Sequence, residues 1–147
     1  MKDGLTAGYI LGIGTDGTDN TVTNTCGVTK SHAFSVPAVF ELTATGGSAE
    51  KVLLVRNPWG TTQYSSDWHK GDARWDANAL SQIPGGINPT TDWNKGYFVV
   101  PVSKMVNGLC FYDYQIAHTR DSAGYQRSWY DAENLDENFH NFFVTVP

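Results

Sequence analysis

Residues 32–57 constrain the fold of this chain more than any other segment. Two runs rich in β-branched and aromatic residues, HAFSVPAVFELT and EKVLLVRN, flank the turn-like stretch ATGGSAE, whose adjacent glycines can adopt positive φ. This pattern predicts an antiparallel hairpin. Pro37 in the first run indicates either an edge position or a β-bulge, because proline cannot donate a ladder hydrogen bond.

The other strand-like segments are short and lie between polar or glycine-rich stretches. They are residues 7–14, 96–102, 109–118 and 139–146. The segment SKMVN (103–107) is long enough for one helical turn. Residues 15–31 and 60–95 lack a regular hydrophobic period and are typical of long loops. The sequence therefore predicts a mostly β domain of about six strands, with almost no helix.

Charge and hydropathy exclude several classes of partner. The net charge is -5 without a basic cluster, so we expect no nucleic-acid partner. No apolar run approaches the roughly 20 residues of a membrane-spanning helix. The glycine-interrupted N-terminus does not resemble a signal peptide, so we expect a cytoplasmic protein with reduced cysteines. On this basis Cys110 is expected to be a small core residue.

One motif match is misleading. Gly12, Gly14 and Gly17 satisfy the pattern G-x-G-x-x-G. A dinucleotide site of this type needs a helix after the glycines, because the helix N-terminus holds the pyrophosphate. The sequence that follows, TDNTVTNTCG, has no helical period. We therefore expect a strand followed by a loop, and no nucleotide cofactor.

The predicted hairpin brings His32 and Asn57 near one another across its two strands. An Asn side-chain oxygen can accept from one imidazole nitrogen and so direct the other nitrogen towards a nucleophile. Trp59 lies two residues further on and is placed to shield that hydrogen bond from water. Taken alone, the pair fits an ordinary, hydrogen-bonded histidine better than a catalytic one.

The surrounding motifs favour catalysis. SHAFSV followed by LLVRNPWG resembles the calpain-type cysteine peptidases, whose second catalytic subdomain carries G-H-A-Y-S-V and then R-N-P-W-G. The resemblance implies the right-hand, β-rich half of a papain-like protease over residues 1–118. It identifies His32 as the general base, Asn57 as its orienting partner and Trp59 as the shielding indole. Residues 119–147 faintly resemble the start of a C2-like β-sandwich.

Two departures from the family pattern concern local residues. Ser31 stands where the family usually has Gly. In the stretch that resembles the calcium-binding loop, Arg74 stands where a Glu is expected, and residues 94–96 read Asn-Lys-Gly instead of an acidic triplet. Because Ca²⁺ needs about 6–8 oxygen ligands, calcium is not a firm expectation. The remaining candidate ligands are Asp72, Asp76 and Asp92.

A third departure concerns the nucleophile. The family cysteine lies in a Q-x-x-x-G-D-C-W segment at a helix start, upstream of the histidine, and this chain contains no such segment. Cys26 lies in a loop without a following helix to lower its pKa, so we do not expect it to be the nucleophile. The oxyanion donors of the family come from the same absent half. We therefore expect this chain to be inactive alone, and to act on protein substrates only with a Cys-bearing half from the same gene or another chain.

Two alternatives remain. The chain is either that catalytic half or a non-catalytic, calpain-derived module that binds other proteins within a larger assembly. A less favoured alternative is a β domain that binds carbohydrate by stacking sugar rings on exposed tryptophans. Its candidates are Trp68, Trp75 and Trp93.

Overall fold

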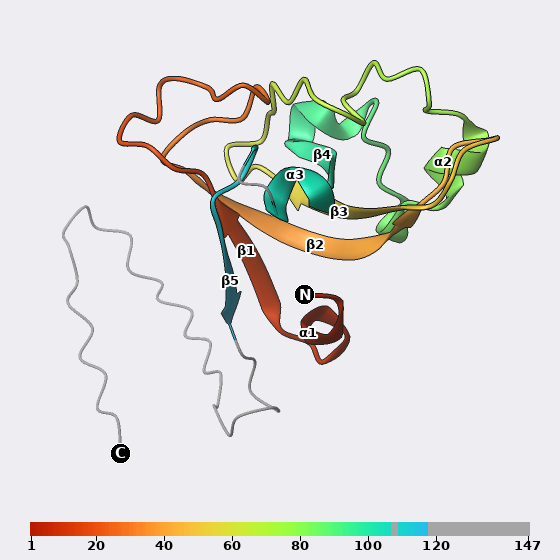
Figure 1. Cartoon of the computed structure of the whole chain (residues 1–147), viewed down its shortest axis with the longest axis horizontal. Coiled ribbons are helices and arrows are strands. Elements are labelled where there is room, and N and C mark those ends of the chain that lie inside the picture. The colour runs from red at the N-terminus through yellow and green to blue at the C-terminus, as the bar shows by residue number, and fades with distance from the viewer. Residues whose placement is uncertain (107–108, 118–147) are drawn as a thin grey trace, which may run out of the picture.

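In the part of the chain that the structure describes, five antiparallel strands form one open sheet in the order β4-β3-β2-β1-β5 (Figure 1). The computed structural model describes residues 1–106 and 109–117 of the chain. The first four strands follow chain order across the sheet, and β5 returns to the opposite edge beside β1. Their bounds are β1 Ile10–Gly14, β2 Ala33–Leu42, β3 Glu50–Arg56, β4 Tyr97–Pro101 and β5 Asp113–Ala117.

Helices are few and short, as the sequence predicts. They are α1 Lys2–Thr6, α2 Ala77–Ser81 and α3 Val102–Val106, with 3₁₀ turns η1 Pro84–Gly86 and η2 Asp92–Lys95. The prediction of a mostly β fold is confirmed, and α3 overlaps the predicted helical turn at 103–107. The sequence did not predict α1 or α2. In the part of the chain that the structure describes, no helix is both long and apolar enough to cross a membrane.

The β2–β3 hairpin is the longest paired element of the sheet. Gly46 adopts a φ of 76° in its turn, where a residue with a Cβ would be strained. The pairing register shifts between Ser35 and Ala38, at Pro37. Because β2 is flanked by β1 and β3, Pro37 marks a bulge and not a sheet edge.

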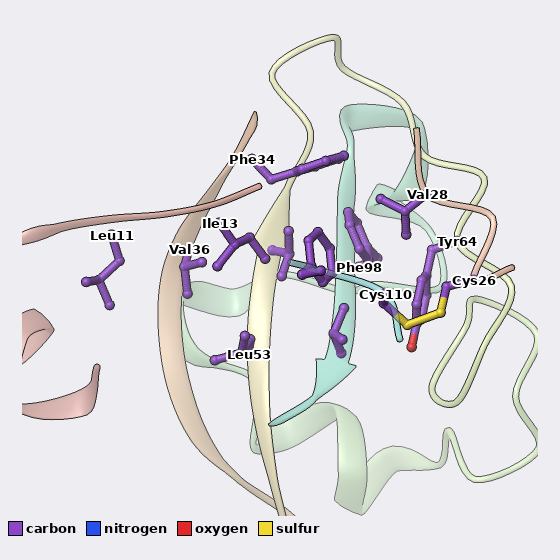
Figure 2. Packing of buried hydrophobic residues seen from close by; sticks show 13 residues of the cluster. Leu11, Ile13, Cys26, Val28, Phe34, Val36, Leu53, Tyr64, Phe98 and Cys110 are labelled. Atoms are coloured by element: carbon purple, nitrogen blue, oxygen red, sulfur yellow. A yellow bond between two sulfur atoms is a disulfide. The ribbon is translucent and has the colours of Figure 1, made fainter. Parts of the chain in front are cut away.

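The strand β3 is buried on both faces, which explains why its sequence does not alternate. Leu53 and Val55 face the first core cluster, while Val52 and Leu54 face the second. The first cluster includes three phenylalanines from β2, β4 and the segment before β5 (Figure 2). The second is covered by the loop after β3 and by α2, through Trp68, Ala79 and Ile83.

A disulfide joins Cys26 to Cys110, which corrects the expectation that both cysteines are reduced (Figure 2). The two side chains are buried in the first core cluster, and their Cα atoms are 5.5 Å apart. Asn24 reinforces the link, because its side chain accepts from the Cys26 N–H and donates to the Cys110 carbonyl. The pairing was missed because 84 residues separate the cysteines, and sequence spacing does not reveal which segments meet.

The predicted strand at 139–146 and the proposed tail at 119–147 lie outside the described residues. The division of the chain at residue 118 therefore remains a prediction.

Candidate active site

The backbone at His32 is held by the end of β1. Thr15 donates its N–H to the His32 carbonyl at 3.0 Å, and its hydroxyl oxygen accepts from the His32 N–H at 3.1 Å. The same hydroxyl donates to the Thr29 carbonyl at 2.7 Å. Ser31, immediately before the histidine, has a φ of 48°, in the left-handed region that L-residues seldom adopt. The backbone that carries the imidazole is therefore fixed in a turn directly before β2.

Asn57 follows the last residue of β3 and is 4% exposed. Its N–H donates to the Gly96 carbonyl at 2.9 Å, which fixes the backbone. Its Oδ1 accepts from the Trp59 N–H at 3.0 Å and lies 2.9 Å from Nε2 of His32. Because an amide oxygen can only accept, Nε2 carries the proton in this pair. The Trp59 N–H independently supports this orientation of the Asn57 amide.

Two aromatic rings enclose the imidazole. The Trp59 ring lies at a centroid distance of 4.0 Å and an interplanar angle of 35°, and Phe34 makes an edge contact at 4.7 Å. Trp59 itself is 55% exposed, so its indole covers the imidazole on the solvent side. Within residues 1–106 and 109–117, the Nδ1 atom of His32 has no hydrogen-bond partner. The arrangement thus presents one imidazole nitrogen with a free lone pair.

The tryptophan-rich loop covers the second core cluster. Trp68 is 2% exposed, packs against Trp75 at a centroid distance of 4.6 Å, and donates its indole N–H to Glu50. The ammonium of Lys70 covers the ring of Trp93 at 3.4 Å. These three indoles pack against protein groups and do not form the exposed platform that sugar stacking requires.

Arg74 occupies the position in this loop that the family resemblance gives to a calcium ligand. Its guanidinium donates to both carboxylate oxygens of Asp72, at 2.9 and 2.6 Å. It also lies 3.8 Å from a carboxylate oxygen of Glu50 and 3.8 Å from one of Asp67. Its carbon centre stands 4.3 Å above the ring of Trp68. Three carboxylates therefore face an internal cation, and the guanidinium holds the pKa of Asp72 well below its usual range.

The other candidate calcium ligands are also engaged. Asp76 accepts from the Ala79 N–H as the N-cap of α2. Asp92 pairs with Lys95 at 2.8 Å, which lowers the pKa of its carboxyl group. Within the described ranges, no group of three or more His, Cys, Asp or Glu side chains is placed to hold a metal ion. The residues of this loop therefore do not fit calcium, because each candidate carboxylate is already engaged by an internal cation or a backbone N–H.

Sequence reasoning missed the supports of the site. Thr15 and Phe34 hold the backbone and the ring of His32, and the disulfide ties the preceding loop to the segment before β5. Phe34 lies within the motif SHAFSV and alternates with exposed neighbours, so its burial could be read from the strand period. Thr15 carries no such signal, because its hydrogen-bond partners Thr29 and His32 lie 14 or more residues away in sequence.

Comparison with known proteins agrees with this geometry. A profile described as calpain family cysteine protease matches residues 1–98, which include all three candidate site residues. The chain belongs to the calpain family. The comparison does not by itself identify which subdomain of the family the chain represents.

Several curated relatives share part of the sequence. Calpain-5 of Caenorhabditis elegans is 30% identical over 56% of this chain and 15% of its own length. Human calpain-8 is 32% identical over 52% of this chain and 11% of its own length. The calpain-1 catalytic subunit of Gallus gallus is 38% identical over 32% of this chain and 6% of its own length. The chain therefore spans a small fraction of these calpains.

Proposed function

We propose that this chain is the His/Asn half of a calpain-like cysteine endopeptidase that cleaves protein substrates. The observation that carries the proposal is the Asn57 amide oxygen shared between Nε2–H of His32 and the Trp59 N–H, with the Trp59 indole packed against the imidazole. An ordinary structural histidine needs no such lid and would have its second nitrogen satisfied. Here that nitrogen is left free of partners among the described residues.

In the assembled enzyme, Nδ1 of His32 takes the proton from a cysteine thiol and the thiolate attacks the scissile carbonyl. The imidazolium then protonates the leaving amine. Asn57 keeps the ring in one orientation through both steps, and its neutral amide stabilises the Nε2–H tautomer without adding a charge. Trp59 excludes water from that hydrogen bond. The other half supplies the oxyanion donors.

The thiolate must come from outside this chain. The chain has two cysteines, and both belong to the buried disulfide. A disulfide sulfur carries no thiolate and cannot act as the nucleophile. The chain alone should therefore be inactive, and the Cys-bearing half should come from a longer form of the protein or from another chain.

The experiment is to mix the chain with a Cys-bearing calpain half and to measure casein hydrolysis. We expect hydrolysis to require both components and to be lost with His32→Ala. His69→Ala is the matched control, because its imidazole accepts a hydrogen bond from the Gly71 N–H in its own turn, and its loss should leave the rate unchanged. The proposal fails if the partner produces no gain in rate, or if His32→Ala is as active as the unmodified chain.

The second candidate is a non-catalytic, calpain-derived module that binds other proteins. The disulfide favours it, since both cysteines of the chain are consumed in a structural link. The same mixing experiment separates the two functions when complex formation is measured by sedimentation. A stable complex without hydrolysis would support the module, whereas hydrolysis that depends on His32 would exclude it.

The cellular compartment is part of this proposal. The expected cytoplasmic location and the Cys26–Cys110 disulfide predict opposite thiol states, because a reducing cytoplasm keeps cysteines free. Acid-quenched cells followed by alkylation and mass spectrometry decide between them. Two alkylated cysteines would support the cytoplasm, and two protected cysteines would support an oxidising compartment.

A further inference from the structure

The loop between β1 and β2, residues 15–32, ends at the candidate catalytic histidine and is tied near its tip by the disulfide. The other half of the disulfide, Cys110, lies in the segment just before β5. That segment is itself fixed to β1, because the Tyr112 N–H donates to the Gly14 carbonyl at 2.9 Å. Figure 2 shows the disulfide at one end of the first core cluster, beside Tyr64. The disulfide therefore closes a ring of contacts that runs from the end of β1 through the loop and back.

Hydrogen bonds connect the disulfide to His32 through this loop. Beside the disulfide, Oδ1 of Asn24 accepts from the Cys26 N–H at 3.0 Å. Three residues after Cys26, the Thr29 carbonyl accepts from the Thr15 hydroxyl at 2.7 Å. The oxygen of that hydroxyl accepts from the His32 N–H at 3.1 Å. The backbone position of His32 therefore depends on the loop that the disulfide anchors.

The other ties at the loop tip are weaker than a covalent bond. Val28 is buried, and the Cys26 carbonyl accepts from the Ser65 N–H at 2.9 Å. Such a hydrogen bond contributes little net free energy, because it replaces a bond to water. Residues 16–23, which lead to the tip, are exposed. Without the S–S bond, this loop should therefore open more readily than the five strands of the sheet.

A surface cavity of about 290 Å³ leads to the disulfide. Its lining includes Cys110, the neighbouring Leu109 and Phe111, and, from the loop, residues 23–25 and Lys30. Cys110 is 2% exposed, whereas Leu109 beside it is 52% exposed, so solvent reaches the wall next to the sulfur. Exchange with an incoming thiol depends on access to a sulfur of the disulfide. The cavity provides that approach once the loop moves slightly.

We propose that the Cys26–Cys110 pair is a redox switch that fixes the turn of His32 when it is oxidised and loosens that turn when it is reduced. The reductant is a small thiol of the glutathione class. A first thiolate attacks Sγ of Cys110, the S–S bond breaks, and Cys26 leaves as a thiolate that takes up a proton. A second thiolate attacks the outer sulfur of the mixed disulfide and releases Cys110, which is protonated in turn. Two small thiols are thus oxidised to one disulfide while the protein disulfide is reduced to two thiols.

The reduced pair also fits its surroundings. Sγ of Cys26 lies 3.6 Å from the Leu109 carbonyl oxygen, which can accept from the thiol that reduction forms. Both cysteines would remain small apolar members of the first core cluster. Reduction should therefore preserve the sheet and remove only the covalent tie of the loop. The switch rests on the proposed function for its consequence, because a loosened His32 would no longer hold Nδ1 in one place for proton transfer.

The test uses the full 147-residue chain, where a reductant has one target because both cysteines belong to this disulfide. Amide order parameters of the ¹⁵N-labelled chain are measured with and without dithiothreitol. We expect the values for residues 23–32 to fall from about 0.85 to about 0.6 on reduction, and those of β3 to stay near about 0.85. The imidazole ¹⁵N shifts of His32 should change from one tautomer to a mixture.

A redox titration and two variants complete the test. In glutathione mixtures that span the poise of the cytosol and of the endoplasmic reticulum, mass spectrometry should find a change from two alkylated cysteines to none. Cys26→Ser/Cys110→Ser should have the loose loop with or without dithiothreitol. Thr25→Ala, at an exposed position beside Cys26, is the control and should respond to dithiothreitol as the unmodified chain does. If the double variant does not fold, the unmodified chain in dithiothreitol still decides the question.

Three results would overturn the switch. The cysteines could stay protected in every glutathione mixture, reduction could leave residues 23–32 and the His32 imidazole unchanged, or the reduced chain could give the spectrum of an unfolded protein. The last result would make the disulfide a structural link and nothing more. Failure of casein hydrolysis with this local redox response intact would count against the proposed function alone.

Discussion

The turn around Asn57 and the loop around Arg74 are both networks of side-chain hydrogen bonds. They differ in whether a functional group of the network remains open to a ligand. At Asn57, one amide oxygen accepts from the imidazole and from a backbone N–H, and the second imidazole nitrogen stays open. At Arg74, the guanidinium is taken up by Asp72 and faces two further carboxylates and an indole. The first region keeps a reactive atom available, whereas in the second the carboxylates already face the internal cations Arg74 and Lys104.

The two regions are also held by different forces. The loop before His32 is tied by a buried disulfide and by the contacts of Thr15. The Arg74 loop is held by ion pairs, and the Arg74 side chain is 39% exposed, so solvent screens part of their strength. The difference implies that redox state controls the first region and that pH and charge control the second. The following predictions test that separation, from the largest effect to the smallest.

Replacing both cysteines should have the largest effect on stability. Closing an 84-residue segment removes much of the entropy of the unfolded chain, and loss of a native disulfide in a small domain costs about 2–5 kcal/mol. We expect Cys26→Ala/Cys110→Ala to lower the free energy of unfolding by this amount in urea titrations. Amide hydrogen exchange should rise in residues 15–31 more than in residues 67–76. Equal increases in both segments would contradict the separation of the two regions.

Asn57→Ala should be the next most damaging change. It leaves the Trp59 N–H and Nε2–H of His32 without their acceptor in a site where Asn57 is 4% exposed. Loss of a buried acceptor costs about 1–3 kcal/mol. Urea titration measures this loss, and ¹⁵N chemical shifts of the imidazole should show a mixture of tautomers in place of one. Asn94→Ala, at an exposed position, is the control. It should change neither the free energy of unfolding nor the imidazole ¹⁵N shifts. A single unchanged tautomer in Asn57→Ala would show that the amide does not orient the ring.

The sequence allowed the first region to be predicted better than the second. His32 and Asn57 are 25 residues apart and flank the open end of one hairpin, directly before β2 and directly after β3, so counting from the turn brings them together. The chemistry of proline limited Pro37 to an edge position or a bulge, and the register shift in β2 shows the bulge. Such features depend on local geometry, which the sequence carries directly.

Features that depend on contacts between distant segments could not be predicted from the sequence. The disulfide needs the fold to bring Cys26 to Cys110, which in turn needs β5 to return beside β1. The helix α2 has only five residues, too few for a hydrophobic period, although Asp76 gives the N-cap signal. The role of Arg74 was also hidden, because its partners Glu50 and Asp67 are not its neighbours in sequence.

Removing the guanidinium should destabilise the second region to a smaller extent. Arg74→Ala loses two charge-assisted hydrogen bonds to Asp72 and the contact with Trp68, in a partly exposed site. We expect a loss of about 1–2 kcal/mol in the free energy of unfolding. Arg74→Lys keeps the charge but not the forked geometry. Its free energy of unfolding should lie between those of Arg74→Ala and the unmodified chain. If Arg74→Ala lost as much free energy of unfolding as the cysteine double variant, the ion pairs of this loop would stabilise the fold as much as the disulfide does, which would contradict the proposed ranking.

Acid should weaken the same loop by protonating the carboxylate that Arg74 holds. The pKa of Asp72 is lowered in the folded chain, so its contribution is present above the ordinary value of 3.8 and is lost as pH falls through the lower folded value. Stability should therefore decline below about pH 4, and this part of the decline should be absent in Arg74→Ala. Urea titrations of the unmodified chain and of Arg74→Ala, from about pH 2 to about pH 6, measure this difference in the free energy of unfolding. Parallel pH profiles would show that the guanidinium does not set the pKa of Asp72.

Calcium should have the smallest effect. Arg74 already binds Asp72 and faces Glu50 and Asp67, and Lys104 pairs with Asp67. A divalent ion would therefore have to displace these internal cations to reach the carboxylate oxygens. Millimolar CaCl₂ should leave the thermal midpoint unchanged relative to the same ionic strength of NaCl, since only an ion that binds the folded state raises it. Arg74→Gln removes the internal cation while keeping polar donors, and should make the loop respond more to calcium than the unmodified chain does. A rise in the midpoint of the unmodified chain, with none in Arg74→Gln, would mean that the guanidinium builds a calcium site and does not replace one.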